Sequence, residues 1–133
     1  MSNRPLLAGA LLSLAVITAP VDASASEDAP AFSRCMEASG GVTVAMLDCI
    51  AAETALQDAR LNREYRDTLA MLSSGQQARL RTAQRSWVQY RDADCGFWAD
   101  PDGGTAASLA VADCVRRMTA ERASDVVRLR PEH

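Results

Sequence analysis

The chain has 133 residues and a formal net charge of −3, from 14 basic and 17 acidic side chains, with 48% hydrophobic and 23% charged residues. A chain of this length accommodates one small domain. Its mildly acidic balance, without a basic cluster, makes nucleic acid and anionic membranes poor candidate partners, whereas a cationic protein partner is compatible with it.

Residues 1–25 have the pattern of an export signal. Arg4 supplies a positive charge, residues 6–19 are mainly apolar, and Ala23-Ser24-Ala25 fits a small-residue cleavage site. The apolar run is shorter than the roughly 20 residues that a membrane-spanning helix needs, so a retained membrane anchor is the less favoured alternative. We expect residues 26–133 to form a single periplasmic or secreted domain without a membrane contact.

A short helical stretch is predicted first, through Phe32, Cys35 and Met36, and the glycine pair at 40–41 ends it. Residues 43–72 contain no Pro or Gly and are rich in Ala, Leu, Arg and Glu, which predicts a helix of about 30 residues. Helical spacing places on its expected buried face Val44, Leu47, Ala51, Thr54, Asp58, Leu61, Tyr65, Leu69 and Leu72. The opposite face carries Arg60, Arg63, Glu64 and Asp67.

A turn at residues 73–75 precedes a second long helix, which is predicted to run to about Trp98. The sequence offers two capping boxes at its start, Ser73 with Gln76 or Ser74 with Gln77. Its expected buried face carries Leu80, Ala83, Gln84, Trp87, Arg91, Asp94 and Trp98.

Residues 99–105 are predicted to form a loop, and a third long helix follows until Pro131 stops it. No segment alternates with a period of two, so we expect no sheet. A short link between two long helices favours an antiparallel pair. The predicted fold is therefore all-α: an antiparallel hairpin of two long helices, a third C-terminal helix and a short N-terminal helical segment.

Polar residues lie on the expected buried faces, where they require hydrogen-bond partners. Folding the chain about residues 74–75 places Asp58 opposite Arg91, with Arg122 as a rival or second donor. We expect this carboxylate to be enclosed, so that Asp58→Ala destabilises the protein by about 3 kcal/mol or more. The whole predicted structural network comprises Asp58, Asn62, Tyr65, Gln84, Arg91 and Arg122.

Four cysteines behind an export signal indicate two disulfides formed in an oxidising compartment. Three pairings are open. Cys49 lies on the back of the first long helix, where the short segment that carries Cys35 is able to cover it. This placement favours Cys35–Cys49 and Cys95–Cys114, each closing a short loop.

Few residues of the chain are suited to catalysis. The only histidine is the terminal His133, and there is no lysine, so general-base and nucleophile roles fall to carboxylates alone. A hydrolase that uses the acidic cluster of Asp92, Asp94, Asp100 and Asp102 is a distant alternative. We expect no enzyme activity, no metal and no cofactor.

Phe97 and Trp98 flank the predicted loop. Large aromatic side chains most often serve packing, and these two would then cap the helical core. The alternative is an aromatic anchor beside Asp100 and Asp102, a composition that suits an interface with a basic partner. We select these four residues as the candidate partner-binding site.

Several blocks of the sequence resemble the lysozyme inhibitor LprI-like family of small exported bacterial proteins. They are Cys49 followed by Asp58-x-x-Leu61-Asn62-x-x-Tyr65, then Leu80-x-x-Ala83-Gln84-Arg85-x-Trp87-x-x-Tyr90-Arg91-Asp92-Ala93-x-Cys95, and finally Cys114-x-x-x-x-Thr119-x-x-Arg122. The resemblance covers about residues 32–129. It implies an all-helical, disulfide-bonded envelope protein and, by extension, inhibition of lysozyme. Unlike the lipoprotein form of the family, this chain has no lipobox cysteine.

The expected function is therefore binding to lysozyme-type muramidases and occlusion of their active-site cleft. The alternative is a non-inhibitory envelope module that binds an unidentified exported protein. The sequence does not indicate an oligomeric state.

Overall fold

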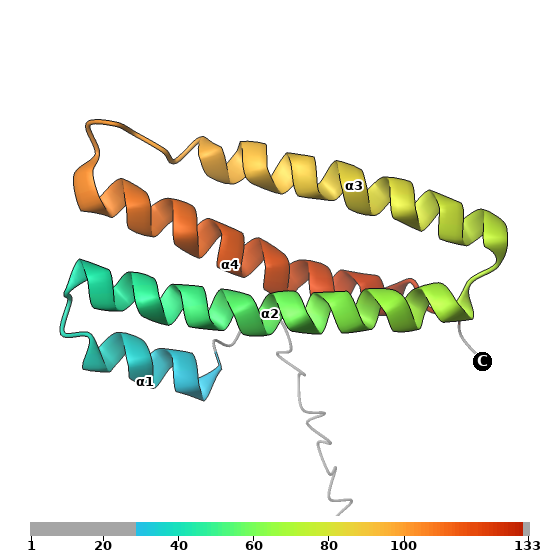
Figure 1. The fold of residues 1–133 in the computed structure, drawn as a ribbon, viewed down its shortest axis with the longest axis horizontal. Coiled ribbons are helices and arrows are strands. Elements are labelled where there is room, and N and C mark those ends of the chain that lie inside the picture. Colours follow the sequence, from blue (N-terminus) through green and yellow to red (C-terminus); the bar gives the residue numbers. More distant parts are fainter. Residues whose placement is uncertain (1–28, 132–133) are drawn as a thin grey trace, which may run out of the picture.

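Four helices make up most of the computed structural model, which describes residues 29–131 (Figure 1). They are α1 (Pro30–Ala38), α2 (Thr43–Met71), α3 (Ser74–Gly96) and α4 (Gly104–Arg128). The part of the chain that the structure describes contains no strand, and the predicted all-α fold is confirmed. The predicted export signal at residues 1–25 lies outside the described residues.

The last helix in the sequence is the middle one in space. α4 packs against both α2 and α3, whereas α2 and α3 diverge from the short link that joins them (Figure 1). Arg60 on α2 contacts Ser124 on α4, and Glu64 contacts Arg130 just beyond α4, so α2 and α4 run in the same direction. α3 is antiparallel to both. The short link between α2 and α3 and their antiparallel course agree with the prediction. The main packing partner of α2, however, is α4.

The buried face of α2 agrees with the expected one only in part, since Leu61 and Leu72 are buried as predicted. Val44, Ala51 and Asp58 on the expected face are exposed. The residues that α2 buries are Cys49, Ile50, Glu53, Leu61 and Thr68. The prediction was wrong here because it took α3 as the packing partner, whereas α4 lies on the neighbouring side of the helix.

The core consists of two small clusters along α4. One contains Phe32, Cys49 and Ile50, with Leu109 and Ala112 packed against it. The second contains Leu61, Ala123 and Val126, which are at most 3% exposed, with Tyr65 and Trp87 at its edge. Each cluster includes residues of α2 and α4, so the apolar interior follows the contact between these two helices.

Polar contacts complete the α2–α4 interface near its C-terminal end. The Thr68 hydroxyl is fully buried, donates to the Val126 carbonyl and accepts from Arg130 Nε at 3.0 Å. Arg130 Nη2 lies 2.6 Å from Glu64 Oε2, and Arg63 contacts the other carboxylate oxygen. The hydrogen bond from Arg130, followed by that from Arg63, lowers the pKa of the Glu64 carboxyl from its usual 4.5. Arg130 thus fixes the end of α4 to α2.

The turn between α2 and α3 uses the first of the two capping boxes. The Ser73 hydroxyl accepts from the Gln76 backbone amide, and the Gln76 side chain accepts from the Ser73 backbone amide. Gln77 has a different role, because its side-chain amide donates to the carbonyls of Leu69 and Leu72 at the end of α2. Its amide satisfies carbonyl groups that a helix leaves free at its C-terminus.

Both predicted disulfides are present. Cys35–Cys49 joins α1 to α2 with a Cα–Cα distance of 5.8 Å, and Cys95–Cys114 joins the end of α3 to α4 at 5.5 Å. Within residues 29–131, no helix has the combination of length and apolar composition that crossing a bilayer requires.

Candidate functional site

The end of α3 presents two aromatic side chains to solvent. Phe97 is 81% exposed and Trp98 is 51% exposed, and their ring centroids lie 5.5 Å apart in an edge-to-face arrangement. Their backbone amides still bond to carbonyls of the last turn of α3, which fixes their position. The sequence left open that these two rings cap the helical core. They do not, because both are exposed and neither belongs to a core cluster.

A tight turn follows the aromatic pair. The side chain of Asp100 accepts from the backbone amide of Asp102 at 2.9 Å, and its carbonyl accepts from the amide of Gly103. Both aspartates are exposed. A Cβ atom at Gly103 would lie 2.9 Å from Ala107 Cβ and 3.0 Å from Asp100 Cβ, so the close approach of the loop to α4 requires glycine. Gly104, with a φ of 59°, starts α4 in a left-handed conformation.

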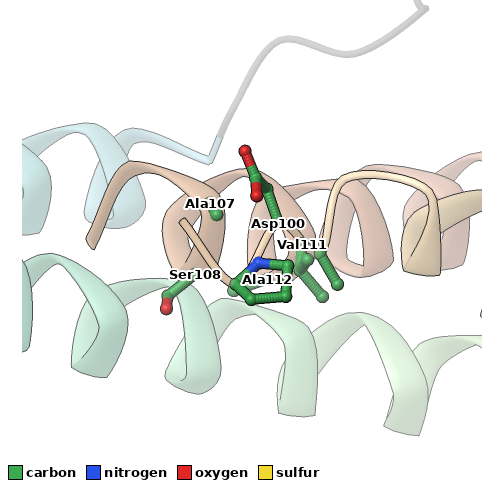
Figure 2. A pocket seen from close by; sticks show the side chains of 7 residues that line it. Asp100, Ala107, Ser108, Val111 and Ala112 are labelled. Carbon is green, nitrogen blue, oxygen red and sulfur yellow. The ribbon is translucent and has the colours of Figure 1, made fainter. Parts of the chain in front are cut away.

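A hollow of about 510 Å³ lies beside this loop. Its wall from the loop is formed by residues 99–101, and its floor by α4 residues Ala107, Ser108, Val111 and Ala112. Figure 2 shows the Asp100 carboxylate pointing away from Val111 and Ala112. The four candidate residues are all exposed and lie within six positions of the chain, and we call them the loop surface: Phe97, Trp98, Asp100 and Asp102. An apolar hollow adjoins it.

The predicted polar network has a different environment from the one expected. Five of its six members line an open cleft of about 460 Å³ between α2 and α3, which we call the polar cleft. They are Asp58, Asn62, Tyr65, Gln84 and Arg91, and the other lining residues are Leu61, Arg81, Arg85, Trp87 and Val88. Residues of α2 and α3 that were predicted to face each other thus line one cleft, but the two helices do not close on each other.

Asp58 is the clearest correction. Its side chain is exposed and accepts a 3.0 Å hydrogen bond from Asn62 Nδ2 of the same helix. Arg91 instead contacts Asp92, through Nε at 3.0 Å and Nη2 at 2.8 Å. The predicted enclosed pair was wrong because α4 separates α2 from α3 and leaves water access to the carboxylate.

The floor of the polar cleft is built on Trp87. The guanidinium carbon of Arg91 lies 5.2 Å from its ring centroid, and that of Arg122 lies 5.8 Å away. Arg122 Nε also donates to Gln84 Oε1 at 3.0 Å, and Arg91 Nη1 reaches the Thr119 hydroxyl at 3.5 Å. These contacts join α3 to α4 and hold the half-buried ring in one place.

Residues that the sequence reasoning missed include Glu53 and Arg116, both buried to below 8% exposure. Glu53 accepts from Gln57 Nε2, and Arg116 contacts Asp113 and covers the Phe32 ring at 4.3 Å. Since charged residues are rarely buried, no periodicity argument identifies them. Across residues 29–131, no group of three or more His, Cys, Asp or Glu side chains is placed to hold a metal ion.

Comparison with known proteins identifies the family. The family model described as lysozyme inhibitor LprI matches residues 35–126, a span that includes all four cysteines, the polar cleft and the loop surface. The chain belongs to this family. No curated protein and no solved structure matches it.

Proposed function

We propose that this member of the LprI family is an exported, non-catalytic protein that binds a lysozyme-type muramidase and blocks its active-site cleft. The observation that carries the proposal is the loop surface, where an exposed aromatic pair stands beside two exposed carboxylates. Family membership supports inhibition as the activity. The loop surface supplies the side chains for it.

The chemistry of the target suits this surface. Lysozymes are commonly basic, and their catalytic carboxylates lie in an open cleft that accepts a polysaccharide. Asp100 and Asp102 would speed the encounter with a cationic enzyme. Phe97 and Trp98 would supply the buried contact area, since aromatic side chains dominate the energetics of most interfaces.

The loop surface is also held in place before any partner arrives. Cys95–Cys114 joins the end of α3 to α4 two residues before Phe97, and the Asp100 turn fixes the backbone between the two aspartates. A preorganised loop loses less conformational freedom on binding than a flexible one. This constraint favours a role in recognition.

Export is part of the proposal. Two disulfides in a chain of this size are typical of an oxidising compartment. Together with the signal predicted at residues 1–25, they support the periplasm or the extracellular space as the place of action. A lysozyme that attacks the cell wall is encountered there.

The test is a cell-wall lysis assay with a hen-type lysozyme and stoichiometric amounts of the protein. We expect lysis to slow, and the double variant Phe97→Ala/Trp98→Ala to lose most of the inhibition. Tyr90→Ala is the matched control, because Tyr90 is a 59% exposed aromatic residue of α3 outside the loop surface. No slowing by the wild-type protein at micromolar concentration would exclude this class of lysozyme. Equal inhibition by wild type and the double variant would exclude the loop surface.

A further inference from the structure

We infer that the polar cleft is a second binding site, which takes a short extended peptide carrying carboxylate groups. This inference goes beyond the proposed function, because it concerns another surface and another ligand. It rests on three features of the cleft: its stable walls, its charge and the distribution of hydrogen-bonding groups over its two sides.

The cleft follows from the packing of the three long helices. α4 separates α2 from α3, and the stack of Arg91 and Arg122 on Trp87 forms a braced floor. The hydrogen bond from Arg122 to Gln84 fixes the floor to the α3 wall. A volume of about 460 Å³ lies within the range of roughly 300–1,000 Å³ that is typical of ligand sites.

The α3 wall is positively charged although the whole chain is acidic. Three arginines line the cleft, at positions 81, 85 and 91, against the single carboxylate of Asp58. Arg91 already contacts Asp92, but Arg81 and Arg85 are exposed and bond only to neutral groups, the Gln77 amide oxygen and the Thr82 hydroxyl. Neither has a carboxylate within ion-pair distance among residues 29–131. A ligand with carboxylates matches these two guanidinium groups, which favour bidentate contacts with them.

The α2 wall has the complementary property. Asp58 and Asn62 are exposed there and present oxygen acceptors as well as an amide donor, with Tyr65 beside them. These groups match the N–H and C=O groups of a peptide backbone. A ligand with carboxylates toward α3 and backbone amides toward α2 satisfies both walls, and an acidic peptide has this arrangement.

The test uses a short synthetic peptide of alternating alanine and glutamate, blocked at both ends, and calorimetric titration of the full chain at low salt. The same peptide with glutamine in place of glutamate is the neutral probe. A third probe, the glutamine peptide with a free C-terminal carboxylate, distinguishes side-chain from terminal carboxylates. In a Trp98→Phe background, Trp87 is the only tryptophan, and its fluorescence should change on binding.

We expect saturable binding of the glutamate peptide, at least about tenfold weaker binding by Arg81→Gln/Arg85→Gln, and weaker binding at high salt. Arg79→Gln is the matched control, since Arg79 is exposed on α3 and does not line the cleft. Asp58→Asn removes the opposing charge and should tighten binding. Helical content by circular dichroism verifies that each variant is folded.

The inference is overturned if neither carboxylate peptide binds, if the glutamate and glutamine peptides bind equally, or if the double arginine variant retains wild-type affinity. Lysozyme inhibition is measured on the same variants. The double arginine variant should inhibit like wild type, because the loop surface is unchanged. If the peptide fails to bind, the proposed inhibition of lysozyme is unaffected. If the protein fails to inhibit lysozyme, the inference about the cleft is unaffected.

Discussion

Asp58 and Arg91 line one cleft from two helices, yet they do not bond to each other. Asp58 accepts from Asn62, and Arg91 donates to Asp92. An ion pair across the cleft would draw α2 toward α3. The lack of such a pair agrees with the position of α4, which packs against both helices and leaves an open cleft between them.

The first prediction concerns the free energy of unfolding of Asp58→Ala. Because this carboxylate is exposed, we expect a change within about 0.5 kcal/mol. Thr68→Val on the same helix should lower stability by about 1–3 kcal/mol, since it leaves Arg130 and the Val126 carbonyl without their buried partner. Urea denaturation of both variants measures the free energy of unfolding. A large decrease for Asp58→Ala would support the enclosed ion pair that the sequence predicted.

The second prediction compares the two tryptophans. Trp87→Ala removes a half-buried ring that packs on the Leu61 cluster and carries two arginines, so we expect a loss of about 2 kcal/mol or more. Trp98→Ala should change stability by no more than about 0.5 kcal/mol, because its ring is half exposed outside the core. Thermal unfolding followed at a helical wavelength measures both. Similar losses would contradict the assignment of Trp87 to the fold and of Trp98 to recognition.

The third prediction is a pH dependence. The pKa of Glu64 is lowered in the folded state by Arg130 and then Arg63, so the ionised carboxylate stabilises the fold. This contribution is complete well above the usual value of 4.5 and is lost as pH falls through the lower folded value. The stability difference between wild type and Glu64→Gln should therefore shrink between about pH 7 and about pH 3. A difference that stays constant over this range would contradict the contact.

The fourth prediction separates the two disulfides. Replacing either pair by serine should lower stability by about 3 kcal/mol, because each closes a short loop. Only Cys95→Ser/Cys114→Ser should also reduce lysozyme inhibition under conditions where the variant is folded, since this bridge supports the loop surface. Cys35→Ser/Cys49→Ser is the control for stability alone. Equal inhibition by the two folded variants would show that the loop does not need its bridge.

The fifth prediction concerns Gly103→Ala. The added methyl group would lie 2.9 Å from Ala107 Cβ and must displace the loop from α4. We expect a weaker affinity for lysozyme with little change in helical content. Gly75→Ala is the control, because a Cβ atom there meets nothing within 4 Å. Unchanged inhibition by Gly103→Ala would argue against a fixed loop geometry.

Local signals in the sequence predicted much of the fold. The limits of α2 follow from the absence of Pro and Gly between residues 43 and 72, and the capping box follows from Ser73 and Gln76. The cysteine pairs follow from the position of Cys49 on the side of its helix that the Cys35 segment is able to cover. The orientation of α2 did not follow, because Glu53 is among its buried residues and its contacts with α4 and Arg130 include Arg60, Glu64 and Thr68. Polar side chains of this kind are read as a solvent face by any hydrophobic pattern.

The candidate sites were predictable to different degrees. Phe97, Trp98, Asp100 and Asp102 were identified from composition beside a loop, and all four side chains are exposed in the structure. Five of the ten residues that line the polar cleft were predicted together as a structural network, but their environment was not predicted. Whether polar residues on facing helices enclose each other or line an opening depends on where a third helix packs. The register between α2 and α3 does not show where α4 packs.

The position of α4 has a consequence for how the protein acquires its structure. In a chain that is synthesised from its N-terminus, α2 and α3 are complete before α4, the helix that packs against both of them, has been added. Neither Leu61 nor Trp87 has its final neighbours until then, and contacts between distant segments form slowly. Completion of the core therefore waits for the last quarter of the chain, and a chain that ends before that point lacks the α4 residues that both core clusters contact.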